Sequence, residues 1–252
     1  VAVRSDLDRE TYQYERQEYW DKPDPEVPLP FYGFNEYTAV MRHGFNTGGA
    51  HLEWVKKHAP ETLALRGRDK QFSHDYSVPQ AIRTKVPEEH YSTSYIADRA
   101  AEWLEARKDN PKPFLLVVSF PDPHHPFTPP GKYWDMYKPE DMAVPAAYEN
   151  DDWDPPEYVK IAERHRANDP SLAQMAGYSL AVSKQEALEA RALTCGMITM
   201  IDDAVGRVRD AASDAGVADN TVQIYTSDHG DHLGEHRLLF KGAEQYDSLT
   251  HV

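Results

Sequence analysis

Apolar residues recur with a helical period in two parts of the chain. The first set is spaced at i, i+4, i+7 and i+8 and consists of Ile96, Ala100, Trp103 and Leu104. Asp109-Asn110-Pro111 should end that helix, because proline cannot continue it. The second set is longer: Leu188, Ala192, Leu193, Met197, Met200, Ile201, Val205 and Val208. Gly216 is a natural C-terminal cap for it, so the pattern predicts two amphipathic helices.

Each predicted helix is followed by an apolar run with the length of a strand. Residues 113–120 (PFLLVVSF) are continuously apolar, which is typical of a strand buried on both faces, and a second run covers 221–227. Helices that alternate with buried strands predict an α/β fold in which helices sandwich a mostly parallel, or mixed, sheet. Ligands in such open sheets bind beyond the carboxyl ends of the strands.

The remaining segments show weaker patterns. Residues 1–85 are rich in proline, tyrosine and charge without a sustained period, which predicts irregular loops with a short helix near 48–55. Residues 86–252 should form the α/β core, and 131–184 should be a long excursion over its surface. We therefore expect one catalytic domain over 1–252, incomplete in its sheet.

Composition excludes several classes of protein. At 252 residues and 40% hydrophobic content, the chain is long enough for a sizeable core. The 27 basic and 42 acidic residues give a net charge of -15, which disfavours nucleic acid as a partner. An anionic ligand would need local positive charge. No apolar run is long enough for a membrane span. The single cysteine, Cys195, allows no internal disulfide and fits a buried helix thiol.

Candidate chemistry follows both predicted strands. Asp228 and His229 come directly after the second one, and a carboxylate beside an imidazole can reach one divalent ion if the loop turns sharply at Gly230. The first strand opens into a proline-rich loop that presents His124 and His125 with little freedom. A solvated polar loop is the alternative interpretation of the first cluster, and a surface or structural histidine pair is that of the second.

Three motifs in this order resemble one family. Pro123-His124-His125-Pro126-Phe127, Ser227-Asp228-His229-Gly230, and Leu233-Gly234-Glu235-His236 followed by Lys241 are similar to the central and later catalytic portion of sulfatases in the alkaline phosphatase superfamily. The resemblance implies an alkaline phosphatase-like fold. It covers most of the chain from about residue 85 onward and, more loosely, the part before it.

The resemblance also implies roles for individual residues. Asp228 and His229 would be metal ligands, with Ca²⁺ as the first choice and Mn²⁺ or Mg²⁺ as alternatives. Lys241 would bind the sulfate group, and His124 would contact the sulfate ester and protonate the leaving oxygen; both would serve catalysis and substrate binding. His125 would be a supporting residue, and neither His232 nor His236 is expected to be a ligand. Loops shape the pocket in sulfatase-like proteins, which makes His43 and His51 candidates to face it, with exposed polar residues as the stronger interpretation.

Two parts of the family's site are missing from the sequence. Sulfatases of this type carry an N-terminal acidic pair that binds the metal and a Cys-x-Pro-Ser-Arg-like motif whose cysteine becomes formylglycine, the nucleophile. Cys195 lacks the proline and arginine of that motif. Because the chain runs from Val1 to Val252 in mid-pattern, we expect an internal fragment, inactive alone, with formylglycine in the missing N-terminal part.

The sequence therefore predicts a sulfuric ester hydrolase that acts on a small-molecule or saccharide sulfate ester. A phosphodiesterase or phosphonate monoester hydrolase of the same superfamily shares these motifs and is the nearest alternative. A non-catalytic relative that binds a sulfated ligand is an alternative of another class. Substrate, localisation and oligomeric state are left open by the sequence.

Overall fold

The structure is a computed structural model that describes residues 13–20, 22, 25–110, 112–150, 153–168, 179–242 and 244–252. Parts of three predicted features lie outside the described residues. They are residues 1–12, 21, 23 and 24 of the irregular region, residues 151–152 and 169–178 of the surface excursion, and Pro111 of the helix breaker.

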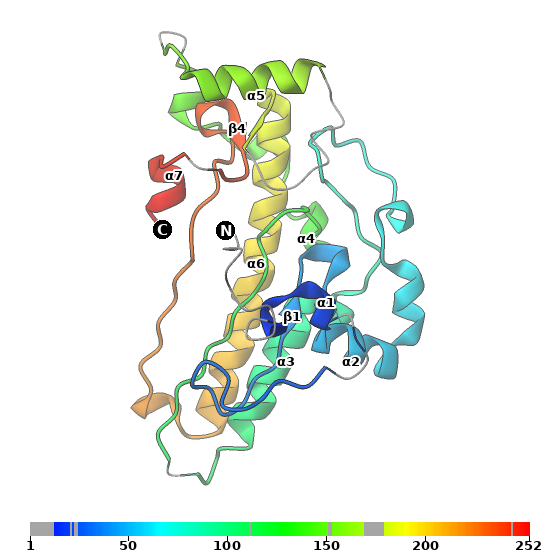
Figure 1. Cartoon of the computed structure of the whole chain (residues 1–252), viewed down its shortest axis with the longest axis vertical. Helices are drawn as coiled ribbons and strands as arrows, with labels where there is room; N and C mark the ends of the chain where they lie inside the picture. Colours follow the sequence, from blue (N-terminus) through cyan, green and yellow to red (C-terminus); the bar gives the residue numbers. More distant parts are fainter. Residues whose placement is uncertain are drawn as a thin grey trace.

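Two long helices form the spine of the molecule (Figure 1). Helix α6 spans Lys184–Asp214, and α3 spans Ser92–Glu105 and packs along it. Helix α6 begins at a capping box in which the Ser183 side chain and Glu186 each accept from the other's backbone N–H. It ends before Gly216, whose φ of 71° is the left-handed conformation that a helix end favours. Both helices predicted from the apolar period are confirmed.

The other elements are short. The remaining helices are α1 (Gln17–Trp20), α2 (Ala50–His58), α4 (Lys132–Asp135), α5 (Glu157–Asn168) and α7 (Asp247–Thr250). Single 3₁₀ turns cover Gln13–Glu15, Gly44–Asn46, Pro60–Leu65, Arg68–Lys70, Glu88–His90, Pro139–Asp141, Ala146–Tyr148, Ala218–Asn220 and Glu235–Arg237. Helix α2 lies where the short helix of the irregular region was expected.

The strands form two small antiparallel sheets. Strands β1 (Val40–Met41) and β2 (Gly48–Gly49) pair with Met41 opposite Gly48. Strands β3 (Leu180–Ala181) and β4 (Leu238–Leu239) pair with Leu180 opposite Leu239. Parallel pairing among the described residues is limited to a single bridge between Ala81 and Phe127.

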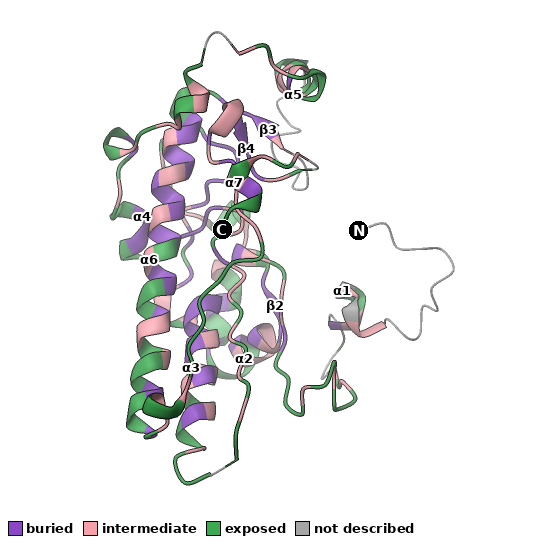
Figure 2. Cartoon of the chain, turned by 90° about the vertical axis from the view of Figure 1, so that its left-hand side faces the viewer, coloured by how far each residue is buried: buried purple, intermediate pink, exposed green. Residues whose placement is uncertain are grey.

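The two segments predicted as buried strands are extended but unpaired. Within the described chain, residues 113–120 and 222–227 make no backbone hydrogen bond to other backbone groups. Leu115 is 73% exposed and Val222 87% exposed, so the predicted burial on both faces is wrong for this structure (Figure 2). A strand is stabilised by a neighbour, and neither segment has one here. The mostly parallel sheet therefore stays a prediction.

The core lies between α6 and the segments that cross it. Its main cluster includes Phe127, Trp134, Leu193, Met197 and Phe240. A smaller cluster joins Leu104 of α3 to Ala211 and Ala212 of α6, with Phe114 and Leu116 packed against it. One face of the segment 113–120 is thus held by the helices.

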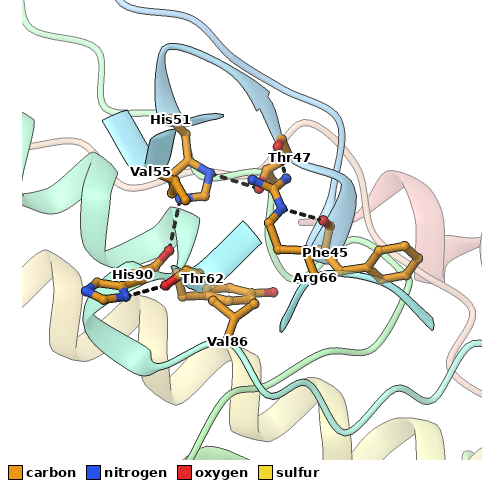
Figure 3. Close-up of a pocket in the computed structure, with 10 residues that line it drawn as sticks. Phe45, Thr47, His51, Val55, Thr62, Arg66, Val86 and His90 are labelled. Carbon is orange, nitrogen blue, oxygen red and sulfur yellow. Dashed lines mark hydrogen bonds between the residues drawn. The ribbon is translucent and has the colours of Figure 1, made fainter. Parts of the chain in front are cut away.

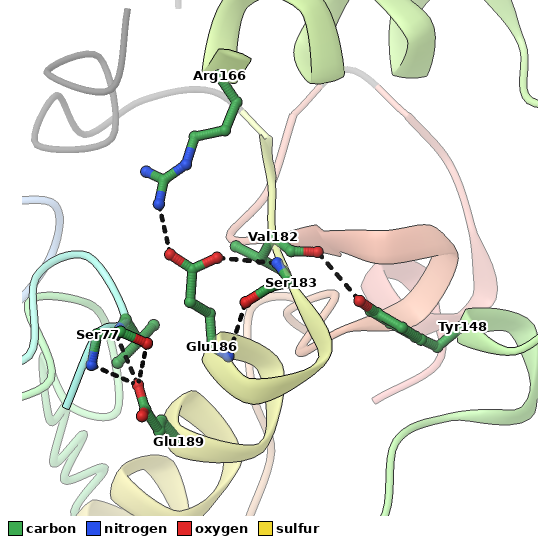
Figure 4. A network of polar contacts seen from close by, with 8 residues as sticks. Ser77, Tyr148, Arg166, Val182, Ser183, Glu186 and Glu189 are labelled. Carbon is green, nitrogen blue, oxygen red and sulfur yellow. Dashed lines mark hydrogen bonds and ion pairs between the residues drawn. The ribbon is translucent and has the colours of Figure 1, made fainter.

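Two buried glutamates of α6 tie neighbouring loops to the spine (Figure 4). The Glu189 carboxylate accepts hydrogen bonds from the backbone N–H groups of Ser77, at 2.8 Å, and Val78, at 2.7 Å. Glu186 pairs with Arg166 of α5. These charges have partners, which satisfies the requirement for burying them. Among the described helices, none combines the length and apolarity that crossing a membrane needs.

Candidate active site

The loop that carries His124 is anchored on the first turn of α3. Asp122 is buried, and its carboxylate accepts hydrogen bonds from the Thr93 hydroxyl at 2.7 Å and from the Tyr91 hydroxyl at 3.4 Å. Burial raises the pKa of Asp122 to about 6, and the two hydroxyl donors oppose that rise. A negative charge at a helix N-terminus is also favoured by the helix dipole. These hydrogen bonds fix the position of the loop that follows residues 113–120, two residues before His124.

A second loop brings His43 onto the same histidine. His43 lies between β1 and β2, and its imidazole stacks on that of His124 with ring centroids 3.6 Å apart and planes at 12°. Gly44, at φ 55°, allows this approach, since a Cβ there would lie 2.9 Å from Pro126 Cγ and 2.9 Å from Thr128 Oγ1. Chain segments 80 residues apart in sequence thus form one wall of the site.

Arg66 holds the loop that carries His43 through the carbonyl groups of Phe45 and Thr47 (Figure 3). Its Nε donates to the Phe45 carbonyl at 3.1 Å, and its Nη2 donates to the Thr47 carbonyl. A cavity of about 10 Å³, room for one water molecule, lies between this guanidinium and His90. His51 is buried beside it, with Nδ1 2.9 Å from Thr47 Oγ1 and Nε2 3.0 Å from the His90 carbonyl. His51 therefore supports the loop and does not face the site.

The side chains of Asp228 and His229 are held next to each other. The His229 backbone N–H donates to Asp228 Oδ1 at 2.9 Å, and the ring Nδ1 donates to the Gly230 carbonyl at 2.7 Å. A carbonyl only accepts, so Nδ1 carries a proton, and in the neutral form of the ring Nε2 keeps its lone pair. That Nε2 lies 3.5 Å from Asp228 Oδ2. Partial burial opposes it, but the charge of His229 and that backbone hydrogen bond hold the pKa of Asp228 below its ordinary value.

The reason for glycine at position 230 differs from the expected one. Its φ is not among the positive values, so the loop does not need a left-handed turn there. Instead, a Cβ at Gly230 would lie 1.9 Å from the Ser248 carbonyl oxygen. The Gly230 N–H also donates to the Leu249 carbonyl at 3.0 Å. The absence of a side chain at Gly230 thus lets the loop that carries Asp228 and His229 lie directly against α7.

The donor pair fits part of a divalent metal site. Metal–ligand bonds of about 2.0–2.6 Å allow two donors 3.5 Å apart to share one ion. Asp228 is exposed, so its oxygen is accessible. No group of three or more histidine, cysteine, aspartate or glutamate side chains is placed to hold an ion within the described segments. Asp228 and His229 thus supply two donors that suit such an ion, and a complete site would need further donors.

Lys241 completes the positive side of the cluster. It follows Phe240, whose backbone N–H donates to Asp231 Oδ1 at 3.0 Å, and Leu233 N–H donates to the same oxygen at 3.1 Å. The Asp231 carboxylate thus closes the loop from 231 to 240. Among the described carboxylates, none lies within ion-pair distance of the Lys241 ammonium. Burial lowers the pKa of Lys241, and Asp231 and Asp228 oppose that shift.

The electrostatic effects of the four predicted residues on one another indicate that they lie close together. Burial lowers the pKa of His124, and the positive charges of Lys241 and His229 lower it further, whereas Asp228 raises it. Burial, then His124 and Lys241, lower the pKa of His43 to about 4. The structure therefore brings together His124, Lys241, Asp228 and His229, and it adds His43. The signal for His43 was weak, because an isolated histidine in an irregular segment is usually a surface residue.

The other histidines lie around this cluster. His125 is buried against Phe240 with ring centroids 4.0 Å apart, and burial lowers its pKa to about 3. His232 is buried, with Nδ1 3.1 Å from Ser248 Oγ. His236 stacks on Tyr246 at 3.9 Å. All three are engaged in packing.

Comparison with known proteins is consistent with this geometry. The family model described as Sulfatase matches residues 12–252. The multifunctional alkaline phosphatase superfamily protein PehA of Trinickia caryophylli is 35% identical over 79% of this chain and 40% of its own length. An arylsulfatase of Clostridium perfringens is 35% identical over 60% of this chain and 29% of its own length. The crystal structure of the phosphonate monoester hydrolase of Agrobacterium radiobacter superposes with a TM-score of 0.58 at 25% identity, over 79% of this chain and 39% of that one.

These similarities place the chain in the alkaline phosphatase superfamily. Within that class, the chain belongs to the sulfatase family. It spans 40% or less of the length of the curated relatives reported above.

Proposed function

We propose that this chain carries part of the active site of a sulfatase, an enzyme that hydrolyses a sulfate monoester. One observation supports the proposal most: the Lys241 ammonium has no ion-pair partner in the described structure and acts electrostatically on His124, beside the Asp228–His229 donor pair. A cation that pairs with no described carboxylate, in a protein of net charge -15, suits an anionic ligand.

The residues have distinct roles in this proposal. Lys241 contacts the non-bridging sulfate oxygens, where its three donors stabilise charge that shifts during the reaction. Asp228 and His229 would hold a divalent ion, with Ca²⁺ as the first choice and Mn²⁺ or Mg²⁺ as alternatives, and such an ion would polarise the ester oxygens. The nucleophile, a formylglycine, and the other metal ligands would come from polypeptide outside these residues. Segments 113–120 and 221–227 would be strands of the sheet that this polypeptide completes.

His124 requires a proton before it can act as an acid. Its Nδ1 donates to the His125 carbonyl, so Nε2 is the ring nitrogen left to hold and give the proton in this proposal. Because its pKa is lowered by burial and by Lys241, the neutral form dominates near pH 7. A bound sulfate ester brings negative charge next to this ring and raises its pKa. We expect His124 to become a proton donor to the leaving oxygen only when the substrate is bound.

The test is hydrolysis by the full-length polypeptide with Ca²⁺ present. We expect 4-nitrophenyl sulfate to be cleaved with a higher kcat/KM than a phenylphosphonate monoester. Lys241→Ala should lower kcat by about 10²–10³, as loss of an oxyanion donor does. Lys138→Ala, at an exposed lysine whose partner Asp135 is on the surface, should leave it unchanged. Equal loss in both variants would contradict the role of Lys241.

A second function is favoured by a specific observation. The solved structure reported above is a phosphonate monoester hydrolase, and the relative from Trinickia caryophylli is described as multifunctional. A tetrahedral phosphonate anion would make the same contacts with Lys241 and the donor pair. A higher kcat/KM for the phosphonate monoester in the same assay would favour this alternative over sulfate hydrolysis.

A further inference from the structure

An aromatic hollow lies next to the loop that carries His43. It has a volume of about 240 Å³ and is lined by Tyr14, Phe31, Tyr32, Phe34, Tyr37 and Met41. Its lining contains no aspartate, glutamate, lysine or arginine. Tyr32 is 70% exposed and Tyr37 45% exposed, so the hollow opens to the surface. An exposed cluster of rings with an uncharged lining among the described residues is typical of a binding surface.

The walls are built before any ligand arrives. Phe31 and Phe34 exchange two backbone hydrogen bonds of 2.9 Å, which closes the turn between them. Trp20 supports the opposite side, since its Nε1 donates to the Tyr14 carbonyl at 2.8 Å and its ring lies 6.0 Å from that of Tyr37. A preformed pocket binds with less loss of conformational entropy.

The ring geometry favours an aromatic ligand. Phe31 is the centre: its ring centroid lies 6.2 Å from Tyr14, 4.6 Å from Tyr32 and 4.8 Å from Tyr37, with interplanar angles of 82°, 70° and 54°. Rings at such angles present both positive edges and negative faces, which another aromatic ring complements. A cation is attracted only to the faces of aromatic rings and not to their edges. A sugar needs several hydrogen-bond partners, and the only polar side-chain groups in this lining are the tyrosine hydroxyls.

Size and position match a single substituted ring. An apolar cavity on the order of 150 Å³ takes up benzene, so 240 Å³ accommodates one ring with a substituent. Met41, which lines the hollow, is two residues from His43 along the chain. Two residues span at most about 7 Å, so the hollow and the His43–His124 stack are neighbours.

We propose that this hollow is a binding site for one aromatic ring. Its assignment as the seat of the aryl group of a sulfate ester rests on the proposed function. The ring contacts do not depend on hydrolysis, so the two proposals are tested separately.

Binding of 4-methylphenol to the full-length polypeptide tests the ring site, by saturation-transfer NMR at pH 7 with tetramethylammonium and glucose as rival probes. We expect 4-methylphenol alone to bind. Phe31→Leu, which keeps an apolar side chain but removes the central ring, should weaken binding by about tenfold or more. Phe72→Leu removes a ring that is 53% exposed outside the hollow, and binding should stay within about twofold of wild type.

Three outcomes would overturn the proposal: equal binding by the two variants, no binding of 4-methylphenol, or preferred binding of a rival probe. If Phe31→Leu fails to fold by circular dichroism, Tyr37→Leu on the exposed rim replaces it, with Tyr37→Phe expected to restore binding. Binding of 4-methylphenol without sulfatase activity in the full-length protein would refute the proposed function and leave the ring site standing.

Discussion

Asp122 should make the stability of this chain depend on pH in a direction opposite to that of most carboxylates. Its carboxyl is buried on the first turn of α3, and its pKa rises from 3.8 to about 6 on folding. The folded state therefore holds a proton that the unfolded state releases between these values. The contribution of Asp122 to the free energy of unfolding is therefore most favourable below pH 3.8. It decreases as the pH rises from 3.8 to about 6 and is constant above that.

The magnitude follows from the same shift. At about 1.36 kcal/mol for each pH unit, the rise from 3.8 to about 6 costs about 3 kcal/mol above pH 6. Asp122→Asn cannot ionise, and its amide oxygen can still accept from Thr93. The variant should thus gain up to about 3 kcal/mol over wild type between pH 4 and pH 7.

Urea unfolding of wild type and Asp122→Asn at pH 4.5, 5.5, 6.5 and 7.5 measures this difference directly. Asp219→Asn, at an exposed carboxylate, is the matched control and should follow wild type at every pH. A free-energy difference between Asp122→Asn and wild type that stays constant over this range would refute the reasoning, because only ionisation of Asp122 makes it vary.

Three further predictions concern packing and capping, and urea unfolding measures each. Gly230→Ala should destabilise the chain by about 1–3 kcal/mol, because its Cβ would meet the Ser248 carbonyl at 1.9 Å; Gly206→Ala, with nothing within 4 Å in α6, should instead stabilise it by about 1 kcal/mol. Leu193→Ala should cost about 2–5 kcal/mol at a core position that is 1% exposed, and a loss below about 1 kcal/mol would contradict the packing described for it. Ser183→Ala should cost about 1 kcal/mol by removing the cap of α6, whereas Ser213→Ala at its exposed end should be neutral.

The helices could be predicted from sequence because their determinants are local. The apolar period of 96–104 and 188–208 is satisfied by α3 and α6 packing on each other, and Gly216 ends the second helix as expected. The strands could not be placed in the same way. Pairing requires a neighbour that is distant in sequence, and residues 113–120 and 222–227 have none among the described residues.

The site shows the same division between local and distant determinants. His124, Asp228, His229 and Lys241 lie in recognisable motifs, and the structure places them in one electrostatic cluster. His43 joins them through ring stacking with a loop 80 residues away, which no local pattern encodes. The buried position of Asp122 could not be predicted from its own segment either, because its hydrogen-bond donors, Thr93 and Tyr91, lie at the start of α3.

Metal content of the full-length polypeptide, measured by mass spectrometry after dialysis against Ca²⁺, tests the central claim most directly. Asp228→Ala should lose most of the bound ion, and His229→Ala should lose part of it. Asp219→Ala, which removes an exposed carboxylate from another part of the chain, is the control and should keep the wild-type metal content. Wild-type metal content in Asp228→Ala would contradict the ligand pair, and with it the site proposed for this chain.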